Sequence, residues 1–166
     1  MNPGINADQL REYVIEPVLS YLHLYSPEAV ELLILTAAHE SAGGHYLHQV
    51  GGGPALGIYQ MEPATHDDIW RNYLEYRHDL DDAVNTWRLV GAPWNDGDPR
   101  PTEMTGNLYY ATAMARIHYL RVPKPLPAAD DLDGLAGYWK AHYNTFAGAG
   151  TVAQAREHYR AYVGLA

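Results

Sequence analysis

The segment from Leu32 to Ala38 is apolar at almost every position, and it constrains the fold more than any other part of the sequence. Ser26 and Pro27 stand where an N-cap and a first-turn proline would begin a helix, and Gly43-Gly44 would end that helix after about Ser41. A helix that is apolar on all sides is a buried helix. The sequence therefore predicts a helix that is enclosed by the rest of the chain.

The apolar periodicity elsewhere is also mostly helical. Further helices are expected over residues 8–25, 63–76, 79–90, 105–120, 132–146 and 151–163, and Pro17 is expected to kink or divide the first of them. Strands are expected only at residues 46–50 and 56–61, as a short hairpin or irregular lobe around the sequence GGGP (51–54). The 166 residues suffice for one domain, so we expect a single mainly α domain over residues 1–166 with a small β or irregular lobe.

Composition argues against several classes of protein. The chain has no cysteine, which excludes disulfides, thiol nucleophiles and cysteine-ligated zinc. A formal net charge of −9, with 11 scattered Lys and Arg residues, argues against nucleic-acid binding. No apolar run is long enough to cross a bilayer, and the first residues lack the basic and apolar regions of a secretion signal. We therefore expect no membrane insertion and synthesis in the cytoplasm without an export signal.

The pair His39-Glu40 raises the possibility of a metal site. The zinc-protease signature His-Glu-x-x-His would need a second histidine where Gly43 stands. His45 and His48 are three residues apart, but the preceding glycines disfavour a helix that would bring them together. We expect these histidines to be polar packing or substrate-facing residues, with no metal and no other cofactor.

Glu40 is the strongest candidate for chemistry. A carboxyl near the end of a buried helix is costly to ionise, so its pKa is expected to rise. An acid with a pKa near neutrality is what cleavage of a glycosidic bond requires, because the leaving oxygen must be protonated. The alternative is a structural role, in which Glu40 pairs with a nearby basic group or helps to cap the helix.

Three sequence blocks bear on this choice: HESAGG (39–44), ALGIYQMEPAT (55–65) and YWKAHYNT (138–145). Together they resemble the lytic transglycosylase and goose-type lysozyme superfamily, in their order and at plausible spacings. They cover the active-site half of the chain, roughly residues 30–65 and 135–147. The resemblance implies a lysozyme-like fold, with the active-site cleft between the helical body and the 45–62 lobe.

The resemblance also implies a role for individual residues. Glu40 would protonate the glycosidic oxygen and then act as the base of the second step. A tyrosine at the place of Tyr143 would hydrogen-bond this carboxyl and hold its rotamer. Contacts with the sugar, or orientation of the acid, would come from Ser41, Gly57, Ile58, Tyr59, Gln60, Tyr143 and Asn144.

This chain departs from the family pattern at three positions. Tyr59 replaces a common methionine, and Thr145 stands where Ala-Gly is common. Glu62 is an additional acid, and goose-type lysozymes, which hydrolyse with water, have an acidic residue at the equivalent place. A transglycosylase needs no second carboxylate, because the C6 hydroxyl of the sugar attacks and forms a 1,6-anhydro ring. Glu62 is therefore either a water-positioning carboxylate or a helix N-terminal acid before Pro63.

The activity implied by the resemblance is that of a muramidase, most simply a lytic transglycosylase acting on the peptidoglycan glycan strand. The alternatives are a hydrolytic lysozyme that uses Glu62, and a non-catalytic virion structural or wall-binding protein with a lysozyme-like fold. Without an export signal, we expect a bacteriophage product that acts on the bacterial cell wall. It would be carried in a virion with other virion proteins, or released as an endolysin through a holin.

Overall fold

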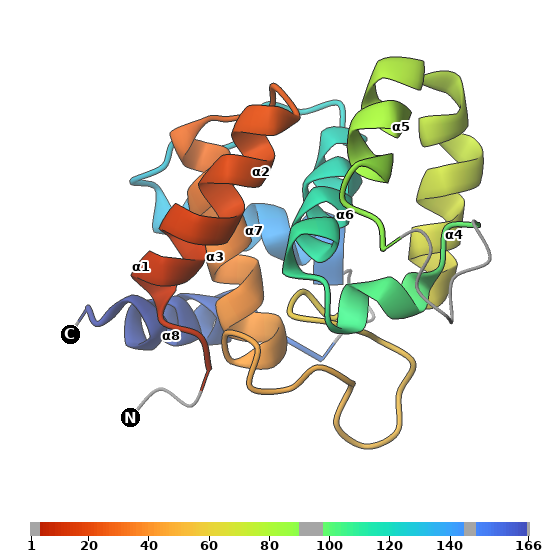
Figure 1. Ribbon diagram of the computed structural model, residues 1–166. Helices are drawn as coiled ribbons and strands as arrows, with labels where there is room; N and C mark the ends of the chain where they lie inside the picture. Colours follow the sequence, from red (N-terminus) through yellow and green to blue (C-terminus); the bar gives the residue numbers. More distant parts are fainter. Residues whose placement is uncertain (1–3, 90–97, 145–148, 166) are drawn as a thin grey trace.

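The computed structural model describes residues 4–89, 98–144 and 149–165, and these residues are mainly helical (Figure 1). In Figure 1, the N-terminal helices, α3, α7 and α8 gather on one side, α4 and α5 lie on the other, and α6 runs between them. The helices are α1 (Ala7–Leu10), α2 (Glu16–Tyr21), α3 (Pro27–Ser41), α4 (Pro63–Asn72), α5 (His78–Asn85), α6 (Leu108–Leu120), α7 (Leu132–Trp139) and α8 (Val152–Val163). None of the helices in these ranges is long and apolar enough to span a membrane.

Helix α3 is enclosed by other elements, as its sequence predicts. The Ser26 hydroxyl accepts a hydrogen bond from the Ala29 amide, 3.2 Å away, and begins the helix. Every side chain from Leu32 to Ala38 is buried, and α8, α7 and α6 all pack against the helix. The helix ends where Ala42 adopts a left-handed backbone with φ of 52°, just before the two expected glycines.

The first predicted helix is divided, and the division precedes Pro17. Residues Arg11–Ile15 form a π-helical turn, in which the Glu16 amide donates to the carbonyl of Arg11, five residues back. Pro17 has no amide hydrogen to donate to the carbonyl of Tyr13. The Tyr109 hydroxyl of α6 donates to this carbonyl instead, at 3.1 Å. The helix also ends at Tyr21 rather than at residue 25.

Two other predicted helices change character along their length. Residues 63–72 are helical as expected, but Tyr73 interrupts the predicted helix, and Leu74–Tyr76 form a 3-10 turn. Helix α5 ends at Asn85, earlier than the predicted end at residue 90, which lies outside the described residues.

The later helices also differ from the prediction at their ends. Thr105 belongs to a 3-10 turn, Pro101–Thr105, and α6 begins three residues later under an Asn107 cap. Helix α7 continues into a second π-helical turn, η4 (Lys140–Asn144), and residues 145–146 of the prediction are not described. The last helix follows Thr151, which serves as its cap.

The segment 42–62 forms an irregular lobe, so only the irregular part of the strand prediction is confirmed. In place of continuous strands, it has isolated bridges that pair His48 with Leu56 and Leu56 with Met61. Left-handed backbone at Gly57 (φ 75°) and Gln60 (φ 47°) bends the chain tightly between the paired ends of the second bridge. The lobe is the long lower loop in Figure 1.

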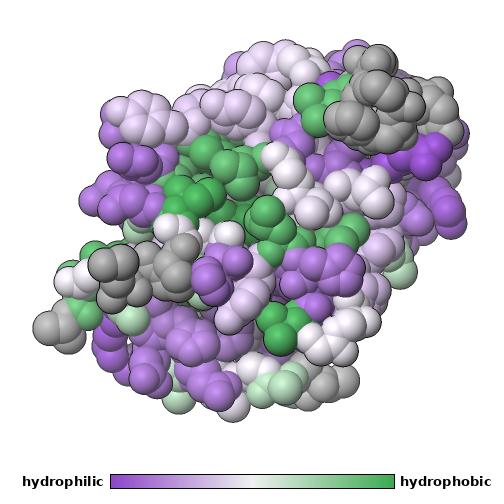
Figure 2. All heavy atoms as spheres, turned by 60° about the horizontal axis from the view of Figure 1, so that its bottom comes forward, coloured by the Kyte–Doolittle hydropathy of each residue, from purple (hydrophilic) through white to green (hydrophobic). Residues whose placement is uncertain are grey.

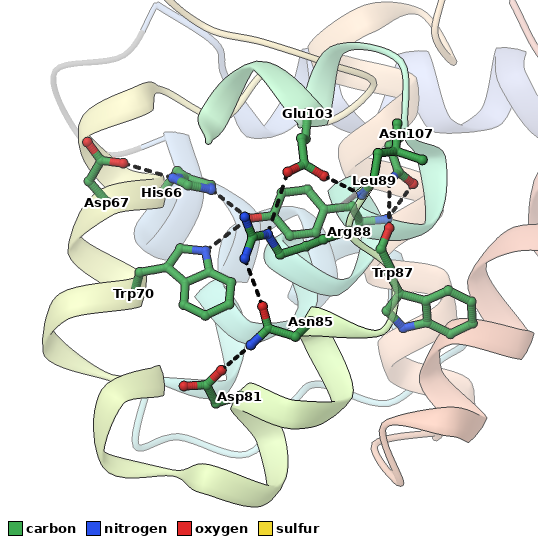
Figure 3. Close-up of polar contacts among 11 residues, drawn as sticks. His66, Asp67, Trp70, Asp81, Asn85, Trp87, Arg88, Leu89, Glu103 and Asn107 are labelled. Carbon is green, nitrogen blue, oxygen red and sulfur yellow. Dashed lines mark hydrogen bonds and ion pairs between the residues drawn. The ribbon is translucent and has the colours of Figure 1, made fainter. Parts of the chain in front are cut away.

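A buried polar network holds the α4–α5 side of the molecule to α6 (Figure 3). Its centre is the Tyr110 hydroxyl, which lies 2.7 Å from Nε2 of His66 and 2.9 Å from the indole nitrogen of Trp70. The Asp67 carboxylate can only accept, so His66 donates from Nδ1, and burial lowers the pKa of His66 and favours the neutral ring. His66 Nε2 therefore accepts from Tyr110, while Trp70 donates to the same hydroxyl.

A second part of the network lies around the buried Glu103 carboxylate (Figure 3). This carboxylate accepts from the amide of Leu89 at 2.9 Å and lies 3.5 Å from the Arg88 guanidinium. The side-chain amide of Asn107 donates to the carbonyl of Trp87 at 2.6 Å. The bonds from Tyr110 to His66 and Trp70 join α4 to α6, and they therefore help to fix the position of Glu62 directly before the first residue of α4.

Replacing Tyr110 with Phe is expected to lower the free energy of unfolding by about 1–3 kcal/mol, because His66 and Trp70 would each keep a buried polar atom without a partner. Urea unfolding of the wild type and the variant measures this difference. Tyr76→Phe is the matched control, since Tyr76 is exposed, and it should stay within about 0.5 kcal/mol of the wild type. Equal stability of the two variants would show that the network contributes nothing.

Candidate active site

A cleft of about 990 Å³ lies between the end of α3, the irregular lobe, the start of α4 and the elements α6, η4 and α8. Figure 2 turns the lower side of Figure 1 forward, and on this side apolar patches interrupt a polar surface. Tyr46 and Val50 of the lobe, exposed by 45% and 69%, contribute to the cleft lining. The cleft is therefore open to large ligands and offers apolar and polar surface together.

Glu40 lies on the cleft wall, in the last turn of α3. Burial raises the pKa of its carboxyl from 4.5 to about 7. The indole nitrogen of Trp139 donates to its Oε1 at 2.8 Å, which stabilises the carboxylate and lowers the pKa, but burial is the larger effect. At neutral pH the carboxyl is therefore close to half protonated and can either give or take a proton.

The neighbouring His39 adds no positive charge that would ionise Glu40. Its ring stacks between Trp139 and His158, with centroid distances of 4.3 and 4.9 Å. Burial, aided by His158 and Lys140, lowers the pKa of His39 to about 4, so the ring is neutral at physiological pH. The environment of Glu40 thus combines low solvation with a neutral neighbour, and both favour the protonated acid.

Four of the residues implied by the resemblance do not line the cleft. Ser41 is buried and donates from its hydroxyl to the carbonyl of Ile58 at 2.6 Å, while accepting from the Gly44 amide at 2.8 Å. Ile58 is buried too, so it cannot contact a ligand in the cleft. In place of the predicted contacts with the sugar, these residues attach the lobe to the end of α3.

Gly57 and Tyr59 also hold the lobe in place and do not line the cleft. A side chain at Gly57 would collide with the carbonyl of Met104, so glycine is required for this close approach. Tyr59 is buried, and its hydroxyl lies 3.0 Å from the hydroxyl of Thr112 on α6. The departure from methionine at Tyr59 therefore serves the packing of the lobe against α6.

The other predicted residues, Gln60, Glu62, Tyr143 and Asn144, do line the cleft. Tyr143 does not hydrogen-bond Glu40 as expected: its hydroxyl donates to the carbonyl of Tyr59 at 2.8 Å. Trp139 takes the predicted role of Tyr143 at the carboxyl. Tyr143 is still close to Glu40, since the carboxylate is one of the groups that raise the pKa of this tyrosine, after burial.

Gln60 and Asn144 are held by contacts within their own segments. The Gln60 amide donates to the carbonyl of Gly57 at 2.8 Å, and the Asn144 oxygen accepts from the Lys140 ammonium at 2.8 Å. Glu62 is exposed and stands at the N-cap of α4, where its side chain makes no capping hydrogen bond. Its carboxylate is thus on the cleft rim in a solvated position.

Sequence reasoning missed Trp139, although the signal was present. Trp139 lies in the third block, four residues before Tyr143, and residues at this spacing share one face of a helix. Its indole is fully buried, so sequence alone would place it in the core. His118 of α6 was also missed; it lines the cleft beside Tyr143, with ring centroids 5.0 Å apart.

The described residues contain no group of three or more His, Asp or Glu side chains placed to hold a metal ion. His45 and His48 are exposed and lie outside the cleft lining. Comparison of the chain with protein-family models, with curated proteins and with solved structures finds no match. Function is therefore inferred from the arrangement around Glu40.

Replacing Trp139 with Phe is expected to raise the pKa of Glu40 further above 7, because the variant removes the one hydrogen bond that favours the carboxylate. An NMR titration that follows the Glu40 carboxyl carbon measures the shift. Trp87→Phe is the matched control, because the indole nitrogen of Trp87 makes no hydrogen bond. A Glu40 pKa that is unchanged or lowered in Trp139→Phe would contradict this account.

The raised pKa of Glu40 also predicts how stability depends on pH. Between pH 4.5 and 7 the folded state binds a proton that the unfolded state has lost, so folding becomes less favourable as pH rises. Glu40→Gln removes this effect. We expect the variant to exceed the wild type in stability by about 3 kcal/mol near pH 8.

The two proteins should be equally stable near pH 4, where Glu40 is protonated in both the folded and the unfolded state. Urea unfolding at both pH values tests this, with Glu75→Gln as an exposed control. A stability difference between Glu40→Gln and the wild type that does not change with pH would show that Glu40 has an ordinary pKa.

Proposed function

We propose that the protein is a peptidoglycan-cleaving muramidase that breaks the β-1,4 bond between N-acetylmuramic acid and N-acetylglucosamine. The observation that carries the proposal is the Glu40 carboxyl, partly buried on the wall of a large cleft with a pKa of about 7. A general acid for glycosidic cleavage needs such a value, because it must hold a proton at neutral pH and release it readily. The three sequence blocks that resemble lytic transglycosylases add support.

In the first step, Glu40 donates its proton to the glycosidic oxygen as the bond from C1 to that oxygen breaks. The carboxylate that remains is stabilised by the hydrogen bond from Trp139. In the second step, this carboxylate takes a proton from the group that attacks C1. The attacking group is the C6 hydroxyl of the same sugar, which gives a 1,6-anhydro end, or water, which gives a reducing end.

We favour the anhydro product, and therefore a lytic transglycosylase. Glu62 is exposed at the N-terminus of α4, where the helix dipole stabilises a negative charge, so its identity has a structural reason. A hydrolytic lysozyme would use the same carboxylate, on the cleft rim, to position water.

Mass spectrometry of muropeptides released from purified peptidoglycan tests the proposal. Products lighter by one water than reducing-end products identify the anhydro ring, which we expect. Glu40→Gln should reduce product release by about 10²–10⁴-fold, the usual contribution of a general acid or base. Circular dichroism of this variant checks that the fold is retained.

Glu62→Gln separates the two reaction types, with Glu75→Gln as the exposed control. We expect Glu62→Gln to release anhydro products at a rate similar to that of the wild type. Reducing-end products that disappear in Glu62→Gln would instead identify a hydrolase. If the folded wild type releases no product, the catalytic proposal fails and the non-catalytic wall-binding alternative takes its place.

A further inference from the structure

Arg116 of α6 is a buried cation without a partner. Its residue is only 9% exposed, and its Nε is buried with no hydrogen-bond partner. Within the described residues, Arg116 takes part in no hydrogen bond and no ion pair. This is unusual in a chain that has 20 acidic and 11 basic residues, because carboxylates are abundant.

Other partly or fully buried arginines of the described chain each have a carboxylate partner. Arg11 pairs with Glu31, Arg121 with Asp68, Arg156 with Asp133 and Arg88 with Glu103. The side chains of Arg11, Arg121 and Arg156 are 25–34% exposed, so Arg116 is more buried than these and is still unpaired. Arg116 therefore differs from these arginines in having no carboxylate partner.

The surroundings of Arg116 are aromatic. Tyr138 and Tyr73 are the ionisable groups near its guanidinium, and neither is a carboxylate. The Tyr138 hydroxyl donates to the carbonyl of Lys124 at 3.1 Å, and the Arg77 guanidinium lies 3.7 Å from the centroid of the Tyr73 ring. Tyr73 thus also has the Arg77 guanidinium over its ring, while the Tyr138 hydroxyl is bound to a backbone carbonyl.

A buried Nε–H without an acceptor is costly, since nothing in the described structure replaces the hydration that it loses. Burial lowers the pKa of Arg116, yet arginine stays protonated in proteins. Its planar N–H groups match the paired oxygens of a carboxylate or phosphate and bind them by two parallel hydrogen bonds. An oxyanion would supply the missing charge and the missing acceptors together.

We propose that Arg116, with Tyr73 and Tyr138 beside it, forms a binding site for a single oxyanion, either a carboxylate or a phosphate group. The site lies outside the cleft lining, in which the described residues include no Lys or Arg. It is connected to the cleft through η4: the His142 ring packs on Tyr138 at 4.5 Å, while the next residue, Tyr143, lines the cleft. A bound anion would therefore sit behind one wall of the cleft.

The first test is an NMR titration of the wild-type protein with sodium phosphate and, separately, sodium acetate at constant ionic strength. The Nε–H resonance of Arg116 should shift in a saturable manner, with a Kd on the order of 1 mM. A resonance that does not saturate with either anion overturns the proposal. This readout needs no variant and no enzymatic activity, so it is independent of the proposed function.

Two variants give a second readout by thermal unfolding. Arg116→Met removes an unpaired buried charge, so it should unfold at a temperature equal to or above that of the wild type without added anion. Phosphate or acetate should raise the unfolding temperature of the wild type and not that of Arg116→Met. Arg71→Met, at a side chain that is 77% exposed, is the control and should respond as the wild type does.

Two results together would assign Arg116 a purely structural role. They are a large loss of stability in Arg116→Met, and an anion-induced rise in the unfolding temperature of Arg116→Lys equal to that of the wild type. The source of the anion is separated by peptides with a free or an amidated C-terminus. Saturation by acetate and by the free peptide alone identifies a carboxylate, and saturation by phosphate alone identifies a phosphate group.

Discussion

The partial burial of the Glu40 carboxyl is the constraint on which the rest of the site depends. It requires that α3 be covered on all sides up to its last turn, which α6, α7 and α8 accomplish. It also requires that no cation stand close by, and the burial of His39 keeps that ring neutral. One donor, Trp139, then offsets part of the cost of ionisation, so that the acid can release its proton without being ionised permanently.

The helical elements were predictable because their signals are local. The all-round apolar run at 32–38 fixed α3 as a buried helix, and Ser26 capped it where expected. Helix ends were less predictable: His23, with φ of 55°, and Ala42, with φ of 52°, end helices in the left-handed conformation, and neither residue carries the glycine signal by which such an end is predicted. The position of the first π-helical turn also depends on Tyr109, which is distant in sequence from the carbonyl that it satisfies.

In the candidate site too, features set by neighbouring residues were predictable from the sequence, and features set by contacts with distant segments were not. Glu40, Gln60, Glu62, Tyr143 and Asn144 were placed on the cleft from the sequence. The sequence did not predict that the side chains of Ser41 and Tyr59 point away from the cleft, because each hydroxyl has a buried partner on another segment. The choice of Trp139 over Tyr143 as the donor to Glu40 depends on how η4 faces α3, and no local pattern encodes that orientation.

The π-helical turn at Lys140–Asn144 has a consequence for how this chain can vary in length. A π turn contains one residue more than an α turn, so the loss of one residue there would restore a regular α-helix. Every later position would then rotate by about 100° relative to α7, the angle between successive residues of an α-helix. The cleft can therefore tolerate substitutions along this wall more readily than a change in register, because a one-residue deletion would move Tyr143 and Asn144 away from Glu40 while leaving Trp139 in place.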